Sequence, residues 1–244
     1  MPMSSFARNA TIVLVHGAWA DGSCWQNVIL PLRKEGLKVT APIPLTSLTE
    51  DIAALERVIE RTRGPMLLAG HAYAGAVIAG AKDDRVKSLV YIAALAPAQG
   101  ETVADVFYRA KPNPEAPHLE PDVHGFIWMP EGFFGRAVAH RVSPEQATIL
   151  EAVQRPLALK CLQEKAALPS WQTKPSWFLL AEEDRMIAPE TQRYMAERMG
   201  AKIRTYNVDH TPMHTAPEVV VGVILEAARE TLAAERVLSG RTHA

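Results

Sequence analysis

The stretch PMLLAGHAYAGAVIAGA, residues 65–81, predicts a short apolar strand over 66–69, a tight turn of small residues over 70–75 and the start of an alanine-rich helix. This order is the outline of a nucleophile elbow, in which a serine between small residues stands at the end of a strand. The serine position here holds Ala72, and a methyl group cannot attack a carbonyl carbon. The alternative interpretation is a Gly/Ala-rich contact between helix and sheet without chemistry, which the flanking strand and helix disfavour.

Composition indicates an ordinary globular chain of 244 residues, with 48% hydrophobic and 22% charged side chains and a net charge of −1. This near-neutral balance disfavours nucleic acid or an anionic membrane as a partner. Cys24 and Cys161 make no disulfide framework, which is typical of a reducing compartment. The first residues lack the apolar segment of a signal peptide, and no apolar run is long enough to span a membrane. We therefore expect a cytoplasmic protein with a small-molecule partner, and a homodimer stays open.

Apolar and β-branched runs predict further buried strands. These runs lie at 11–15, 37–41, 87–93, 176–180 and 203–207. Because helical patterns separate the strands, we predict a doubly wound, mostly parallel α/β sheet.

Four helices with start or stop signals lie between these strands. One covers 25–34, and a second follows the capping-box pattern of Ser47 and ends before Gly64-Pro65. A third covers 189–199 and is closed by glycine, and the last is capped by residues 215–218 and runs to about Arg236.

The stretch 97–174 is rich in proline, contains no convincing buried strand and is too long for a structureless loop. We therefore predict a mostly helical inserted lid over 97–174, with the core domain formed by 1–96 and 175–244.

Acyl transfer through a serine needs an imidazole that accepts the hydroxyl proton and a carboxylate that orients the imidazole. The carboxylate candidate is Asp184, beyond a predicted strand, and Glu182 and Glu183 are its competitors. The imidazole candidate is His210, in the loop before the last helix, and His214 is its rival. A metal site at the two histidines is disfavoured, because a proline lies between them and no further ligand is evident.

Two backbone N–H groups must also face the oxyanion of the intermediate. The loop after the first strand and the residue after the nucleophile position supply them in this motif, which nominates Ala18 and Tyr73. We interpret His16 as a structural histidine that hydrogen-bonds within its turn, while Gly17 lets this loop approach the elbow.

Four segments together resemble the α/β-hydrolase superfamily, in particular the small lidded esterases that include plant methyl esterases, hydroxynitrile lyases and bacterial relatives. They are HGAWADGSCW, GHAYAGAVI, EEDRMI and DHTPMHTAPE. The resemblance implies Ala72 at the nucleophile position, Asp184 as the acid and His210 as the base, with no cofactor or metal. It also implies an apolar pocket under the lid, although an aromatic cluster fits the core of a lid equally well. The candidate substrate-binding residues are Trp19, His71, Phe126, Trp128, Phe133 and Phe134.

The resemblance implies a hydrolase for esters, lactones or amides with a hydrophobic or aromatic group, and Ala72 leaves three interpretations open. The one we favour is a serine replaced by alanine in an otherwise complete site, which leaves the chain inactive as an esterase. The second is proton abstraction by the His210–Asp184 pair, as in a cofactor-free dioxygenase or a lyase. A hydroxynitrile lyase is disfavoured, because the site loops lack the lysine that those enzymes use. The third is a non-catalytic ligand-binding relative.

Overall fold

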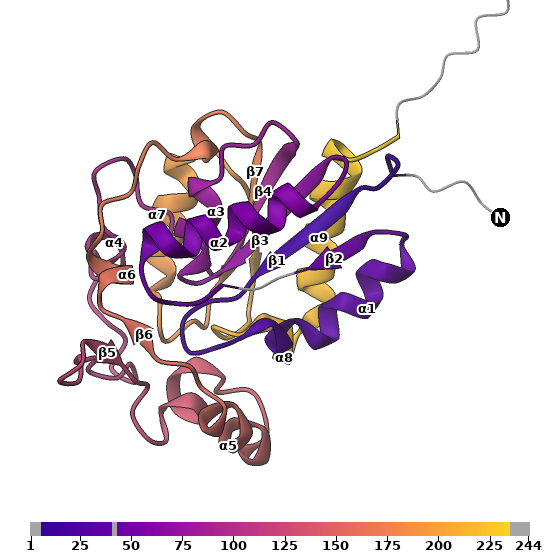
Figure 1. Ribbon diagram of the computed structural model, residues 1–244. Helices are drawn as coiled ribbons and strands as arrows, with labels where there is room; N and C mark the ends of the chain where they lie inside the picture. The colour runs from indigo at the N-terminus through magenta and orange to yellow at the C-terminus, as the bar shows by residue number, and fades with distance from the viewer. Residues whose placement is uncertain (1–5, 41–42, 235–244) are drawn as a thin grey trace, which may run out of the picture.

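The computed structural model describes residues 6–40 and 43–234. At its centre lies a six-stranded sheet in the order β2-β1-β3-β4-β7-β8, and every neighbouring pair is parallel. The doubly wound parallel sheet predicted from the sequence is confirmed (Figure 1). The strands are β1 Thr11–Val15, β2 Lys38–Thr40, β3 Met66–His71, β4 Val86–Ile92, β7 Ser176–Ala181 and β8 Lys202–Tyr206.

Helices cover both faces of the sheet, as a parallel sheet with fully buried central strands requires (Figure 1). On one face, α2 (Leu48–Arg61), α3 (Ala74–Gly80) and α7 (Pro189–Arg198) contribute to one apolar cluster. On the other face, α1 (Gln26–Lys34) and α9 (Pro217–Thr231) contribute to a second cluster.

The strands end within two residues of their predicted ends, and Ala41, predicted to close the second strand, lies outside the described residues. The second helix differs more. The Ser47 side chain accepts a bond from the Glu50 N–H, but the Glu50 carboxylate accepts from the Thr46 hydroxyl and does not complete a capping box. The helix also ends at Arg61, before the predicted glycine stop.

The last helix was predicted too long and with the wrong cap. α9 begins at Pro217 without a side-chain cap, because its N-cap residue is Ala216 and not Thr215, whose hydroxyl donates to Asp209. The helix ends at Thr231, whereas its predicted end at Arg236 lies outside the described residues.

Residues 97–174, which we call the inserted segment, lie between β4 and β7 at one end of the sheet (Figure 1). Short helices are present, but they cover a minor part of the segment, which is therefore not mostly helical as we expected. β5 and β6 also form an antiparallel pair that the sequence did not indicate. Strands of two residues are too short for alternation to reveal them. The elements are α4 Val103–Phe107, β5 Phe126–Ile127, the π-helical turn Phe134–Val138, α5 Pro144–Ala152, β6 Leu157–Ala158, α6 Lys160–Gln163 and the 3-10 turn Ser170–Gln172.

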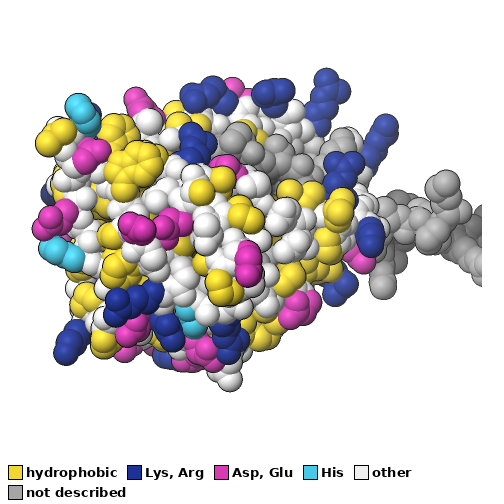
Figure 2. Space-filling model, turned by 90° about the horizontal axis from the view of Figure 1, so that it is seen from below, with side chains coloured by type: hydrophobic (Ala, Val, Ile, Leu, Met, Phe, Trp, Pro, Cys, Tyr) yellow, Lys and Arg dark blue, Asp and Glu magenta, His cyan; other side chains and the backbone are white. Residues whose placement is uncertain are grey.

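The surface seen from below mixes charges of both signs with scattered apolar side chains, in keeping with the net charge of −1 (Figure 2). Among the described residues, no helix has the length and apolar character needed to cross a membrane. The carboxyl ends of β1, β3, β7 and β8 lie at one edge of the sheet because the strands are parallel. Open α/β sheets place their ligand sites at this edge.

Candidate functional site

The elbow predicted around Ala72 is present at the end of β3. Ala72 has a φ of 49°, in the left-handed region that a non-glycine residue adopts only where its surroundings hold it. Its carbonyl accepts bonds from the N–H groups of Gly75 and Leu95. A Cβ at Gly70 would lie 2.7 Å from the Ala74 carbonyl oxygen, so the turn requires a glycine there. The residue 72 side chain is thereby held at the top of the sheet.

Asp184 and His210 come together from the loops after β7 and β8. The His210 Nδ1 donates to Asp184 Oδ2 at 2.7 Å, and both side chains are buried. The other carboxylate oxygen accepts the backbone N–H groups of Met186 at 2.7 Å and Ile187 at 2.9 Å. Because Nδ1 is engaged, the imidazole Nε2 is left for proton transfer, as in a nucleophile–base–acid site.

Gln192 on α7 also contacts Asp184, and the sequence did not reveal it as a site residue. Its Nε2 donates to Asp184 Oδ2 at 2.8 Å and to the Ile187 carbonyl at 2.9 Å, and its Oε1 accepts from the Ala181 N–H. The amide therefore fixes the loop that carries the acid. The one signal in the sequence was a polar residue four positions before Ala196, on the buried face of α7.

The rival candidates lie elsewhere. Glu182 pairs with Arg193, and Glu183 pairs with Arg141, both near the surface. His214 lines the pocket described below but makes no bond to the acid. Within residues 6–40 and 43–234, no group of His, Cys, Asp or Glu side chains could hold a metal ion.

The two predicted oxyanion donors, Ala18 and Tyr73, line one pocket together with Ala72. In the part of the chain that the structure describes, no hydrogen bond uses the backbone N–H of Ala18 or of Tyr73. Gly17 makes this approach possible, since a Cβ there would lie 3.0 Å from the Ala72 Cβ. His16 has the structural position that we predicted: it is buried, and its Nδ1 donates to the Gly17 carbonyl at 3.0 Å.

Two pockets meet at Ala18, Trp19, Ala72 and His210, which line both. The first, which we call the Asp21 lobe, has a volume of about 630 Å³ when space open to solvent is counted, and Asp21 is its only charged carboxylate among the described residues. The second, which we call the apolar lobe, has a volume of about 380 Å³ on the same basis and is almost wholly apolar. Its other lining residues are Tyr73, Leu95, Phe107, Leu119, Leu157, Leu162, Met186 and Ile187.

The predicted substrate-binding residues divide into two groups. Trp19, His71 and Phe134 line the Asp21 lobe. Phe126, Trp128 and Phe133 line neither lobe, so a role of these three in substrate binding stays a prediction that the two lobes do not support. Trp128 is 48% exposed and donates its indole N–H to Asp122, and Phe133 lies under the Arg136 guanidinium. Phe126 lies in β5 and pairs with Ala158 of β6. Position within the inserted segment, rather than aromatic character, decides which residues reach the pocket.

His71 supports the loop of His210 from below. Its Nε2 donates to the His210 carbonyl at 2.7 Å, and the two rings lie 4.8 Å apart. Burial, and secondarily the neighbouring His210, holds the pKa of His71 well below its usual value. His71 is therefore neutral at neutral pH and donates from Nε2.

The lowered pKa of His71 predicts a pH-dependent stability. In the unfolded chain the His71 imidazole takes up a proton near pH 6.5, whereas in the folded chain it stays neutral at this pH. The free energy of unfolding is therefore highest above pH 6.5 and decreases as the pH falls below it. One such histidine costs about 1.4 kcal/mol per pH unit below its unfolded pKa. We expect urea unfolding between pH 7 and 5 to show a shallower pH dependence in His71→Gln, and no change in the exposed control His124→Gln. Equal slopes in the parent and His71→Gln would contradict this assignment.

A model of the alpha/beta hydrolase family matches residues 12–223. The chain belongs to this family. The matching stretch includes Ala72, Asp184 and His210.

Similar proteins include several esterases. The carbendazim hydrolyzing esterase of Nocardioides sp. (strain SG-4G) is 33% identical over 119 residues, which are 42% of this chain and 49% of that protein. The pyrethroid hydrolase of Sphingobium wenxiniae is 24% identical over 247 residues, covering 89% of this chain and 87% of the relative. Among solved structures, tomato methylketone synthase I has a TM-score of 0.78 at 18% identity, covering 92% of this chain and 99% of that one. This last likeness shows the fold.

Proposed function

We propose that the two-lobed pocket is the site of a carboxylic-ester hydrolase of the Ser-His-Asp type, with Ala72 at the position of the nucleophilic serine. One observation carries the proposal: Ala72 and His210 line the same two lobes, while Asp184 holds the His210 ring at 2.7 Å. The similarity to a carbendazim hydrolyzing esterase and a pyrethroid hydrolase supports ester hydrolysis as the reaction.

In a form with serine at position 72, His210 Nε2 removes the hydroxyl proton as the oxygen attacks the carbonyl carbon. Asp184 stabilises the imidazolium, and the N–H groups of Ala18 and Tyr73 hold the oxyanion. His210 then returns the proton to the leaving alcohol and activates the water that hydrolyses the acyl-enzyme. With alanine at this position the pocket binds the ester but forms no acyl-enzyme, and only ~10³–10⁴-fold catalysis over water is left.

The lining of the lobes defines the substrate class. The apolar lobe offers only apolar side chains apart from His210, and the Asp21 lobe has the Asp21 carboxylate, so both lobes suit uncharged groups. The inserted segment, as a lid, contributes Phe107 and Leu119 to the apolar lobe and Phe134 to the Asp21 lobe. We therefore assign an uncharged ester with a hydrophobic or aromatic group on each side of the scissile bond.

Two measurements test this function together. The Ala72→Ser variant should hydrolyse p-nitrophenyl esters, and the alanine chain should bind the same esters without rapid cleavage. A serine variant no faster than the alanine chain would contradict the proposal.

A second candidate uses the chain as it stands, with the His210–Asp184 pair as its acid–base group. Ala72 lacks the oxygen that a serine would supply, but the other two side chains of the site are in place. His210 and Asp184 are buried and hydrogen-bonded to each other, and Asp184 also accepts a bond from Gln192. The tomato methylketone synthase I structure contains a β-keto acid, beta-ketoheptanoate, on the same fold. These observations favour a lyase that decarboxylates β-keto acids.

Decarboxylation of a β-keto acid needs no nucleophile at position 72. The bond between the α-carbon and the carboxylate breaks, CO₂ leaves, and the electron pair moves to the ketone oxygen as an enolate. The N–H groups of Ala18 and Tyr73 stabilise that oxygen, and protonated His210 delivers its proton to the α-carbon to give a methyl ketone. The apolar lobe favours loss of a carboxylate as neutral CO₂.

We expect CO₂ release from β-ketoheptanoate by the unmodified chain to fall to the buffer rate in His210→Ala, a loss of about 10²–10⁴-fold. The matched control is His124→Ala, an exposed histidine of the inserted segment, which should keep the full rate. The unmodified chain releasing CO₂ at the buffer rate, or His210→Ala retaining the rate, would contradict the lyase.

A further inference from the structure

A second buried acid, Asp51, lies outside the groups that the mechanism uses. It stands in the first turn of α2 and is fully buried, at 0% exposure, beside the larger apolar cluster. No cationic side chain pairs with it among the described residues. A buried carboxylate without a cation is costly, and an apolar residue of similar size is often as stabilising or more so. A contribution to stability alone therefore does not explain an acid at position 51.

The bonds of Asp51 lead to the elbow and to the inserted segment. Oδ2 accepts the Tyr73 hydroxyl at 2.7 Å and contacts the Cys161 Sγ at 3.7 Å. Oδ1 accepts the Leu45 N–H at 2.8 Å. Burial raises the pKa of Tyr73 and raises that of Cys161 to about 12, so both groups keep their protons and donate.

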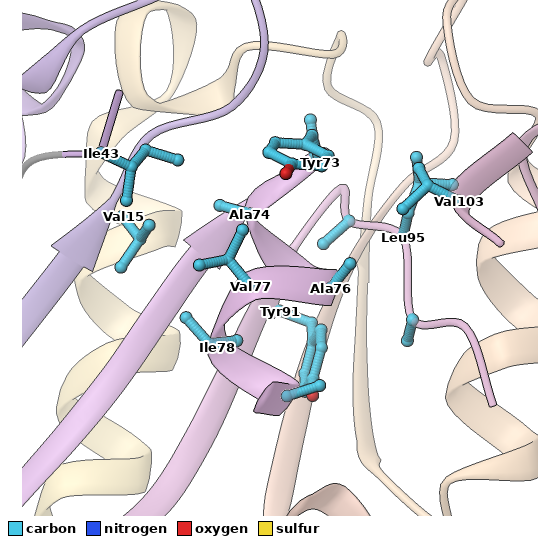
Figure 3. Packing of buried hydrophobic residues seen from close by; sticks show 14 of the residues in the cluster. Val15, Ile43, Tyr73, Ala74, Ala76, Val77, Ile78, Tyr91, Leu95 and Val103 are labelled. Atoms are coloured by element: carbon cyan, nitrogen blue, oxygen red, sulfur yellow. The ribbon is translucent and has the colours of Figure 1, made fainter. Parts of the chain in front are cut away.

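Tyr73 is the residue whose backbone N–H we assign to the oxyanion hole. Its ring lies at the start of α3, between Ile43 on one side and Leu95 and Val103 on the other (Figure 3). The phenol oxygen at the far end of this rigid ring is the atom that Asp51 holds. Only two side-chain torsions connect the ring to the Tyr73 backbone. A ring that is fixed at both ends therefore limits rotation of the peptide that carries the Tyr73 N–H.

The inserted segment is joined to the same acid. Cys161 belongs to α6, and the Leu45 carbonyl accepts the N–H of Ala158 in β6 at 3.1 Å. Leu45 itself has a φ of 65°, a strained conformation that the Asp51 bond to its N–H helps to hold.

We propose that Asp51 is a positioning residue that sets the Tyr73 backbone N–H for the oxyanion and links it to the inserted segment through Leu45 and Cys161. The proposal rests on the oxyanion role of Tyr73 within the proposed function. Asp51 acts through Tyr73, because neither lobe of the pocket includes it among its lining residues.

The test compares two probes that share an aryl ring but differ at the reacting group. Methyl phenylphosphonate is a tetrahedral anion and demands the oxyanion donors, whereas methyl benzoate is planar and neutral. In the chain as it stands, Asp51→Asn should weaken phosphonate binding about tenfold and methyl benzoate binding less than about twofold, measured by calorimetry. The amide signal of Tyr73 in ¹⁵N-tyrosine-labelled protein should shift with phosphonate, and shift less in Asp51→Asn.

A double-mutant cycle shows whether Asp51 acts through the phenol. Tyr73→Phe should match Asp51→Asn, and the double variant should be no worse than either. Asp83→Asn is the matched control, an acid paired with Arg85 at the opposite end of the sheet, and should change neither probe. Thermal midpoints accompany each variant, so a loss of folding is recognised because both probes then weaken together.

In the Ala72→Ser background, Asp51→Asn should lower kcat about tenfold with little change in KM. Equal weakening of both probes, unchanged phosphonate binding, or no phosphonate binding by the parent chain would each overturn the Asp51 proposal. If Ala72→Ser hydrolyses no ester while the phosphonate discrimination is present, the ester hydrolase function fails and the positioning role of Asp51 stands.

Discussion

Replacing Ala72 with serine is expected to raise the rate of p-nitrophenyl butyrate hydrolysis at least ~10³-fold over the alanine chain. The variant adds one oxygen to a side chain that the left-handed turn already holds in place, so the elbow needs no rearrangement. The His210 ring, fixed by Asp184 at 2.7 Å, lines the same lobes as the new hydroxyl and supplies the base. The measurement is the initial rate of p-nitrophenolate release at saturating ester.

Ala201→Ser is the control for this variant, since it adds the same hydroxyl between α7 and β8, at the opposite edge of the sheet. It should stay at the rate of the alanine chain. If Ala72→Ser and Ala201→Ser hydrolyse the ester equally slowly, the elbow does not present residue 72 to a bound ester.

Replacing Asp184 with asparagine in the Ala72→Ser background should lower kcat by about 10⁴-fold. An asparagine amide fills the same space, but it can offer an N–H to the imidazole and so favour the tautomer that cannot accept the serine proton. The N–H groups of Met186 and Ile187 would still donate to the side-chain oxygen at this position, so the fold is expected to persist. The measurement is kcat with the same ester, alongside the thermal midpoint.

Glu183→Gln is the matched control, because this neighbouring acid pairs with Arg141 and not with His210. Its kcat should stay within about twofold of the parent. Equal losses in Asp184→Asn and Glu183→Gln would mean that Asp184 does not orient the base.

The sequence predicted the parts of the site that depend on local pattern. Ala72 follows an apolar strand and precedes a helix, and Asp184 and His210 follow strands of the same parallel sheet. Because the carboxyl ends of parallel strands share one edge, strand assignment alone brings these residues together. The bond between Asp184 and His210 then follows from the loop lengths.

Residues whose partners are distant in the chain were not predictable in this way. Asp51 lies on a helix whose pattern explains its apolar neighbours, but its partner Cys161 is 110 positions away. Gln192 likewise contacts Asp184 only through tertiary packing. The inserted segment lacks long helices or strands, so its hydrophobic pattern could not predict which aromatic side chains face the pocket. Phe134 lines the pocket, whereas Trp128 is exposed.

The most direct measurement is the mass of the tryptic peptide covering residues 64–82 after the Ala72→Ser variant reacts with a fluorophosphonate. We predict one phosphonyl adduct on the serine at position 72, formed within minutes in the folded variant and lacking in the alanine chain. A peptide without adduct, or an adduct confined to another serine, would contradict the placement of residue 72, His210 and Asp184 in one catalytic site.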